Sequence, residues 1–131
     1  MPSRDFATNI DQVNPIQRDK VNNIVKYLAY GHQGIVRKIV LFGSSITDRA
    51  TEESDIDIAI DFYEPEIVRT RDGGKKYARY ANEKFISWVR FATEETGASI
   101  VDMEDLRTCP YDYCHGVAEA VASGVVIYEE K

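Results

Sequence analysis

The stretch from residue 43 to residue 61, GSSITDRATEESDIDIAID, decides the fold of this chain. It follows the apolar run Ile39–Phe42, whose composition predicts a buried strand that ends at Gly43-Ser44. Ten residues lie between Ser44 and Asp55, which opens an Asp-x-Asp on a second segment with strand character. Two strands joined by a glycine turn and a short loop are therefore expected here.

The turn after the first strand has the composition of a phosphate-binding site. Gly43 and Ser44 bring backbone N–H groups and a hydroxyl to one point, and such groups at the start of a helical turn bind phosphate oxygens. Ser45 and Arg49 follow closely and are further candidates for contacts with phosphate. For Arg49, simple solvent exposure is an equally good interpretation.

The Asp-x-Asp segment alternates between acidic or small residues and isoleucine from Asp55 to Asp61. This period of two predicts a strand with its isoleucines on the core side and with Asp55 and Asp57 together on the other face. Their Cα atoms should lie roughly 6.6 Å apart, so both carboxylates can reach one Mg²⁺ or two adjacent ions. Asp61 lies about 13 Å beyond Asp57, too far to share that metal.

A two-metal site for group transfer normally needs a third carboxylate. The β-branched pair Ile100-Val101 predicts a strand over residues 98–103, and Asp102 on this strand is the candidate. Glu104 and Asp105 follow closely, and either is an alternative third ligand. The competing interpretation of Asp102 is an exposed acid without a ligand role.

Length and charge limit the class of protein. The chain has 131 residues, which suits a single domain over 1–131, with the polar residues 1–13 loosely held. It carries 16 Lys and Arg against 22 Asp and Glu, and the net charge of −6 disfavours binding to long nucleic acid or to an anionic membrane. No apolar segment is long enough to span a membrane and the N-terminus has no targeting pattern, so a cytoplasmic location is expected.

Cys109 and Cys114 are the two cysteines of the chain, and His115 follows the second. These three residues fall short of a four-ligand zinc site, and His32 has no ligand-like spacing to them. We expect two reduced thiols with a structural role.

The remaining segments alternate between helical and strand patterns, which predicts an α/β fold with a short mixed sheet and helices packed against it. Asn14-Pro15 offers an N-cap and a first helical residue, and Gly31 and Gly34 would end the helix that follows. The apolar face expected for this helix consists of Ile16, Val21, Ile24, Val25 and Leu28.

The second half of the chain has a charged, loop-like stretch over residues 66–74 and then a long helical pattern over residues 75–95. A short helix over 111–122 leads to a last strand over 125–128. The residues expected on the apolar side of the long helix are Tyr77, Tyr80, Ala81, Phe85, Trp88 and Phe91.

With these motifs in order, the chain from Val36 to Tyr128 resembles the minimal nucleotidyltransferases of the DNA polymerase beta superfamily. The resemblance implies a polymerase beta palm-like fold and a transfer of a nucleoside monophosphate, most often AMP from ATP, to a hydroxyl acceptor. It also implies a site with two Mg²⁺ ions. By resemblance, Gly43 and Ser44 bind the triphosphate, whereas Asp55, Asp57 and Asp102 hold the metal and carry catalysis.

The ten-residue spacing between Ser44 and Asp55 is also similar to that of antitoxin members that attach AMP to a HEPN toxin. A helical partner protein of that kind, or a second copy of this chain, is therefore a candidate partner. One alternative is a non-catalytic binding module that masks such a partner. Another is a nucleotidyltransferase that acts on an aminoglycoside, although members of that group usually carry an additional helical domain.

The chain departs from many minimal members in the length of the segment over residues 63–97. This segment contains basic residues that would either cover a bound triphosphate or simply lie in solvent. They are Arg69, Arg71, Lys75, Lys76 and Arg79. The sequence leaves the acceptor, the base and the oligomeric state open.

Overall fold

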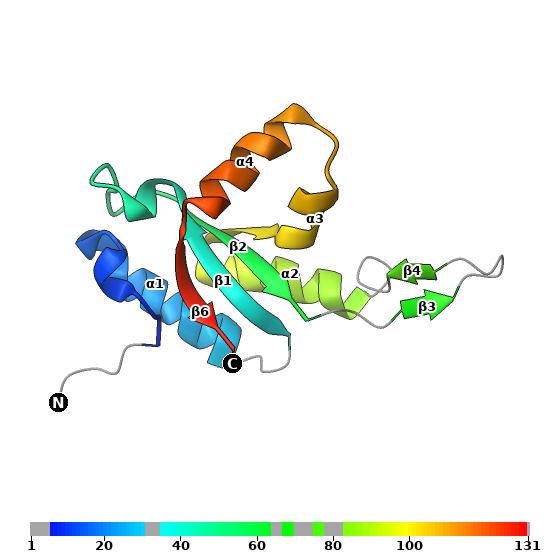
Figure 1. Cartoon of the computed structure of the whole chain (residues 1–131). Helices are drawn as coiled ribbons and strands as arrows, with labels where there is room; N and C mark the ends of the chain where they lie inside the picture. The colour runs from blue at the N-terminus through cyan, green and yellow to red at the C-terminus, as the bar shows by residue number, and fades with distance from the viewer. Residues whose placement is uncertain (1–5, 31–34, 64–66, 70–74, 78–82, 131) are drawn as a thin grey trace.

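A four-stranded mixed sheet forms the centre of the molecule in the computed structural model, which describes residues 6–30, 35–63, 67–69, 75–77 and 83–130. The strands are β1 (Val36–Phe42), β2 (Ile56–Phe62), β5 (Ala98–Asp102) and β6 (Val125–Glu129), in the order β5-β2-β1-β6. β1 runs antiparallel to β2 and β6, whereas β2 and β5 are parallel (Figure 1). The predicted α/β class with a short mixed sheet is confirmed.

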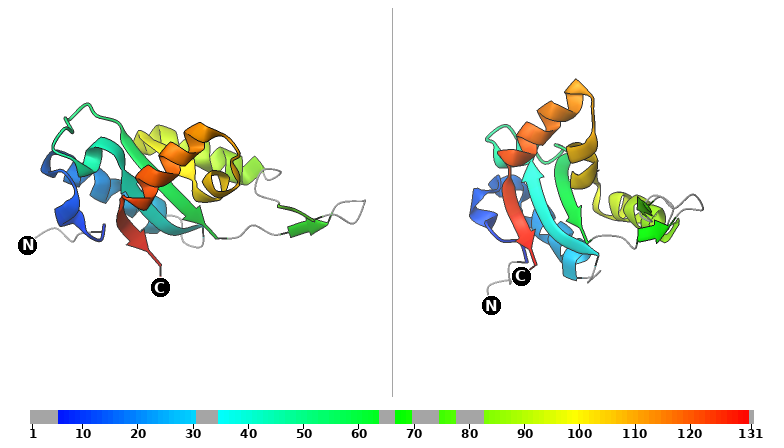
Figure 2. Two further views of the ribbon diagram at one scale, coloured as in Figure 1. Left: turned by 45° about the horizontal axis from the view of Figure 1, so that its top comes forward. Right: turned by 45° about the vertical axis from the view of Figure 1, so that its right-hand side comes forward.

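Helices cover both faces of this sheet (Figure 2). The α-helices are α1 (Arg18–Val25), α2 (Glu83–Thr96), α3 (Met103–Thr108) and α4 (Asp112–Ala122). Shorter helical turns are η1 (Ile10–Gln12), η2 (Pro15–Gln17), η3 (Lys26–Tyr30) and η4 (Gly43–Ile46). α1 and α2 contribute to the larger core cluster, whereas α4 contributes to a smaller cluster around Val40, Phe42 and Ala59.

The alternation along β2 has the expected effect on packing. Ile56, Ile58 and Ile60 are buried in the larger cluster, and Ala59 is buried in the smaller one. Both faces of this strand are therefore covered over its central part. Asp57 lies two residues before Ala59 on the same face of the strand. It is partly exposed, because the residues of α4 in the smaller cluster do not cover it.

The first helix begins as predicted, because the Asn14 side-chain oxygen accepts a hydrogen bond from the N–H of Ile16 at 3.0 Å. Four of the five predicted apolar residues are buried, but Ile16 is 53% exposed. The buried position in this turn belongs to Gln17 instead. Gly31 and Gly34 lie outside the described residues.

Gln17 is buried because it binds the loop that precedes β2. Its Nε2 donates hydrogen bonds to the backbone oxygens of Thr51 at 3.2 Å and Ser54 at 3.0 Å. Lys20 Nζ donates to the backbone oxygen of Glu52 at 2.6 Å, one residue after Thr51. Side chains at the start of the first helix thus donate to three carbonyls of a loop that belongs to no helix or strand.

The segment before this helix differs from the expectation of a loosely held N-terminus. Ala7 and Val13 are buried in the larger core cluster. The backbone N–H groups of Phe6 and Ala7 donate to the side-chain oxygen of Asn22, and the N–H of Thr8 donates to the backbone oxygen of Ile127. Residues 6–13 therefore form part of the packed structure, while residues 1–5 lie outside the described ranges.

The expected long helix over residues 75–95 is only partly correct. β3 (Ile67–Arg69) pairs antiparallel with β4 (Lys75–Tyr77), and α2 begins at Glu83. The β-branched pair Ile67-Val68 favours a strand, and Asp72-Gly73-Gly74 separates the two paired segments in the sequence. A hairpin pairing thus replaces the first turn of the helix that the apolar spacing predicted.

The aromatic residues of this region have mixed outcomes. Trp88 packs against the core, with its ring centroid 5.7 Å from that of Phe62. Phe91 is 50% exposed. Tyr80 and Ala81 lie outside the described residues, as do Arg71 and Arg79. For Tyr77, Phe85, Arg69, Lys75 and Lys76 only the backbone is described, so the cover over a triphosphate stays a prediction.

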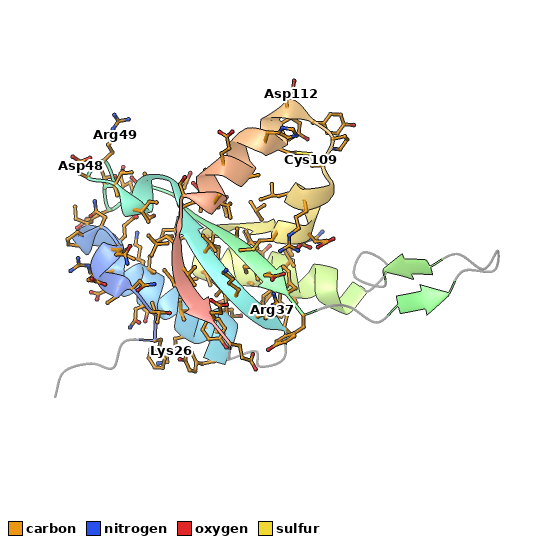
Figure 3. All side chains as sticks on the ribbon, in the orientation of Figure 1. Lys26, Arg37, Asp48, Arg49, Cys109 and Asp112 are labelled. Atoms are coloured by element: carbon orange, nitrogen blue, oxygen red, sulfur yellow. A yellow bond between two sulfur atoms is a disulfide. The ribbon has the colours of Figure 1, made fainter. Side chains whose placement is uncertain are left out.

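The prediction of two reduced thiols is wrong, because Cys109 and Cys114 form a disulfide. The chain turns between α3 and α4, and this turn brings the two Cα atoms within 6.2 Å, a separation that a disulfide can bridge. The bond therefore joins the end of α3 to the first turn of α4 (Figure 3).

Within the described ranges, no helix combines the length and the apolar character needed to cross a membrane.

Replacing Gln17 with alanine should lower the free energy of unfolding by about 2–3 kcal/mol, because the carbonyls of Thr51 and Ser54 lose the hydrogen bonds from its Nε2 and a cavity opens in the core. Urea unfolding followed by circular dichroism measures this effect. Ile16→Ala, in the same turn but exposed, is the matched control and should change stability by no more than about 0.5 kcal/mol. Equal effects of the two substitutions would show that the Gln17 contacts contribute nothing specific.

Candidate active site

The pairing of β1 with β2 brings the Gly-Ser turn against the Asp-x-Asp. Phe42 lies opposite Asp57 in the antiparallel register, so Gly43 follows directly at the end of the shared ladder. Gly43 has φ +79°, and a Cβ at this residue would lie 2.8 Å from Oδ2 of Asp57. A side chain at position 43 would therefore need both a strained backbone and the space that the Asp57 carboxylate occupies.

Gly43 begins the short helical turn η4, whose backbone N–H groups lie beside this carboxylate-bearing strand. Ser44 is partly buried, and its backbone oxygen accepts hydrogen bonds from both the N–H and the Oγ1 of Thr47 at 3.0 and 2.9 Å. Ser45 is fully buried, and its Oγ has no hydrogen-bond partner among the described residues. A role for Ser45 in phosphate binding would therefore fall to its backbone N–H.

Asp55 and Asp57 are held close together at the start of β2. Asp55 is exposed and Asp57 is partly buried. Burial raises the pKa of the Asp57 carboxyl above its ordinary value of 3.8, and the negative charge of Asp55 raises this pKa further. Among the described residues, no Lys or Arg forms an ion pair with either aspartate. Two adjacent anionic side chains without a cationic neighbour form an electrostatic conflict that a bound cation would remove.

Arg49 lies on the loop between η4 and β2, apart from the two aspartates. Its side chain is exposed, and Figure 3 shows it pointing outward at the tip of that loop, next to Asp48. Its backbone N–H donates to Oγ1 of Thr47 at 3.2 Å. The structure thus presents Arg49 to solvent, which was one of its two interpretations.

Asp102 does not join the other two aspartates in this structure. In the parallel pairing of β2 with β5, Asp102 lies opposite Ile60, three residues along the strand from Asp57. Its side chain accepts a hydrogen bond from the N–H of Glu104 at 3.0 Å and so caps the N-terminus of α3. Ile60 lies three residues from Asp57, so the two side chains point to opposite faces of β2. Asp102, which pairs with Ile60, is therefore on the opposite face of the sheet from Asp57.

The alternative third ligand Glu104 belongs to a different charged cluster. Its carboxylate pairs with Arg107 at 2.9 Å, and Arg107 also reaches Asp61 at 3.9 Å. Asp61 pairs with Arg37 at 3.0 Å. This cluster lies at the far end of β2 from Asp57, as expected for Asp61. Within it, Arg37 and Arg107 neutralise the two acids. Asp105 lies within α3.

The residue of β5 that does lie opposite Asp57 is Ser99. Neighbouring residues in register on adjacent strands point to the same face, so the Ser99 side chain shares the face of Asp57. Ser99 is exposed. Sequence reasoning missed this residue because a search for acids passes over a serine; only an alignment of β5 against β2 could have found it.

These observations define an α/β protein of the polymerase beta-like nucleotidyltransferase class, with a Gly-Ser turn and an Asp-x-Asp in contact at one end of a mixed sheet. The chain belongs to the nucleotidyltransferase domain family, whose model matches residues 18–116. The match supports the DNA polymerase beta superfamily and the transfer of a nucleoside monophosphate as the general activity. No curated protein and no solved structure matches the chain.

The family usually uses divalent metals, and the residues of this site fit such an ion in part. Asp55 and Asp57 supply the oxygen ligands that Mg²⁺ prefers, and the missing side chain at Gly43 leaves the Asp57 carboxylate accessible at its Oδ2 edge. In the portion of the chain that the structure describes, no three His, Cys, Asp or Glu residues gather into a metal-binding group. Two carboxylates would fit one ion, with water and phosphate oxygens as its other ligands. Among the described side chains, none supplies the third carboxylate expected for two ions.

Gly43→Ala should destabilise the chain by about 1 kcal/mol more than Gly97→Ala. Both glycines have positive φ, +79° and +69°, but a Cβ at Gly97 would meet no atom within 4 Å. Gly97→Ala therefore measures the backbone strain alone, about 1 kcal/mol, whereas Gly43→Ala adds the contact with Asp57. Urea unfolding of both variants gives the difference, which should vanish when Asp57 is also replaced with alanine. A difference that persists without the carboxylate would contradict this geometry.

Asp57→Asn should make the folded chain more stable at neutral pH. Because the pKa of Asp57 is raised in the folded state, ionisation of this carboxyl opposes folding, and this cost is present above the raised pKa and lost below 3.8. The gain in stability from the substitution should therefore shrink as the pH falls through the raised pKa. Urea unfolding at stepwise lower pH tests this trend. Asp61→Asn, which instead breaks the ion pair with Arg37, should give no gain.

Proposed function

We propose that this protein transfers AMP from Mg²⁺-bound ATP to a hydroxyl group of a partner protein. The observation that carries the proposal is the close approach of Gly43 to Asp57, which joins a phosphate-binding turn to a carboxylate pair at one point of the surface. The family supports the transfer of a nucleoside monophosphate in general. The base, the metal and the acceptor are the proposed part.

The reaction is an in-line displacement at the α-phosphorus of the triphosphate. The acceptor oxygen forms a bond to the α-phosphorus while the bond from this phosphorus to the bridging oxygen breaks. Pyrophosphate leaves, and the hydroxyl proton is released to solvent. Mg²⁺, when bound, would neutralise the negative charge that develops on the attacking and leaving oxygens.

The residues of the chain contribute binding and orientation. The backbone N–H groups of the turn that starts at Gly43, with the Ser44 hydroxyl, bind oxygens of the triphosphate. Asp55 and Asp57 hold the cation that accompanies it, and this removes the repulsion between their two negative charges. When bound, such a cation would supply positive charge between the carboxylates and the triphosphate, while the turn that starts at Gly43 orients the α-phosphorus.

A protein acceptor is proposed from the resemblance to antitoxin members that modify a HEPN toxin. The spacing of ten residues between Ser44 and Asp55 supports it. The net charge of −6 supports a partner other than a long nucleic acid. The chain would thus modify a helical toxin-like protein and so control its activity.

A second candidate is a binding module that occupies such a partner without modifying it. The observation that favours this alternative is that the described residues bring two carboxylates together and not three. A site with a reduced ligand set would bind a nucleotide while transferring its monophosphate slowly or not at all.

The double substitution Asp55→Asn/Asp57→Asn should abolish the transfer of label from α-labelled ATP to a partner protein, because the cation loses both carboxylates. The assay uses purified chain, Mg²⁺ and cell lysate as a source of acceptor, and it measures both labelled protein and released pyrophosphate. Asp61→Asn is the matched control: it lies on the same strand but pairs with Arg37 at the far end, so it should label the acceptor at the wild-type rate.

Label that persists in the folded double variant would refute the assignment of the site. Wild-type chain that binds ATP but gives neither label nor pyrophosphate would favour the binding module.

A further inference from the structure

The parallel pairing of β2 and β5 determines which side chain lies next to Asp57. The register places Asp57 opposite Ser99, Ile58 opposite Ile100 and Ala59 opposite Val101. The packing agrees with this register, because Ile100 contacts the larger core cluster with Ile58, and Val101 contacts the smaller cluster with Ala59. Ser99 therefore shares the face of Asp57, at an interstrand Cα separation of about 4.8 Å.

Among the side chains that the structure describes, neither Asp102 nor Glu104 is placed to replace Ser99. Asp102 lies about 10 Å further along the strand from Ser99, on the other face, and caps α3. Glu104 pairs with Arg107 in the cluster around Asp61. The position beside Asp57 is thus occupied by a short neutral side chain that is exposed to solvent.

We propose that Ser99 occupies the third position of the cation site, so that this chain holds its cation with two carboxylates and a neutral hydroxyl. This inference rests on the proposed function, because it assigns a residue to the same site. A hydroxyl carries no charge and is a weaker ligand for a divalent cation than a carboxylate, so the site binds the free cation weakly. The cation then depends on the phosphates of the nucleotide for its remaining ligands.

A carboxylate at position 99 should strengthen the site. Ser99→Asp adds a third negative ligand beside Asp57 and is expected to lower the dissociation constant for Mn²⁺ alone by about tenfold, since the number of charged ligands sets the affinity of such sites. Ser99→Asn adds the same bulk without the charge and should leave the constant unchanged. Asp102→Asn should also leave it unchanged, because Asp102 lies at the cap of α3.

The experiment titrates the full chain and each variant with Mn²⁺ at neutral pH and measures the free ion by electron paramagnetic resonance. Asp57→Asn serves as the reference for loss of the site. Circular dichroism establishes that each variant is folded, and Ser99→Glu replaces Ser99→Asp if the latter is not. Position 99 is exposed on an edge strand, so a charged side chain there needs no rearrangement of the core.

Tighter Mn²⁺ binding by Ser99→Asp alone supports the inference. It is overturned if Ser99→Asp binds no more tightly than the wild type, if Ser99→Asn binds equally tightly, or if Asp102→Asn weakens binding as much as Asp57→Asn does. Each of these results leaves the proposed function intact, provided that Asp57→Asn weakens binding. Binding that is insensitive to Asp57→Asn would overturn the proposed site itself, and this inference with it.

Discussion

The antiparallel pairing of Phe42 with Asp57 is the constraint on which the rest of the site depends. It places the end of β1 and the beginning of β2 at the same end of the sheet, although ten residues separate Ser44 from Asp55 in the sequence. The turn that leaves β1 must then pass directly over the Asp57 carboxylate. Only glycine fits there, because it tolerates φ +79° and has no Cβ to meet Oδ2 at 2.8 Å.

The loop that this pairing creates is held by the first helical segment and not by its own secondary structure. The backbone N–H of Asn14 donates to the backbone oxygen of Ser45 at 2.8 Å, and its side-chain amide donates to the backbone oxygen of Thr47 at 2.7 Å. Gln17 and Lys20 donate to the backbone oxygens of Thr51, Ser54 and Glu52. Each of these bonds supplies a donor to a loop carbonyl, although the carbonyl of Thr51 also accepts from the N–H of Ser54 within the loop. A turn fixed in this way loses little freedom when a ligand binds, which favours a preformed site.

The charges along β2 are distributed unequally between its two ends. Asp61 is paired with Arg37 and lies near Arg107, whereas Asp55 and Asp57 repel each other and the pKa of Asp57 is raised. A structural strand end would be expected to neutralise its acids, as the Asp61 end does. Acids that have no ion pair among the described residues and lie next to a glycine turn are typical of a binding site, because a ligand can bring the positive charge.

The sequence by itself determined the two central strands, the face of each β2 side chain and the α/β class, whereas the need for glycine at position 43 follows from the pairing that brings Asp57 beneath it. The first three properties depend on local patterns: a period of two, an apolar run, and a turn residue directly after it. The tertiary structure alone decided that Ser99, and not Asp102, lies beside Asp57. These two residues are three positions apart on one strand. Which of them lies beside Asp57 depends on the register of β5 against β2, and roughly forty residues separate the two strands in the sequence. The alternating pattern within either strand does not determine that register. Three further features escaped prediction for related reasons. The burial of Gln17 and the pairing of β4 with β3 each require a partner outside the local pattern. The bond between Cys109 and Cys114 requires a turn whose shape the pattern does not specify.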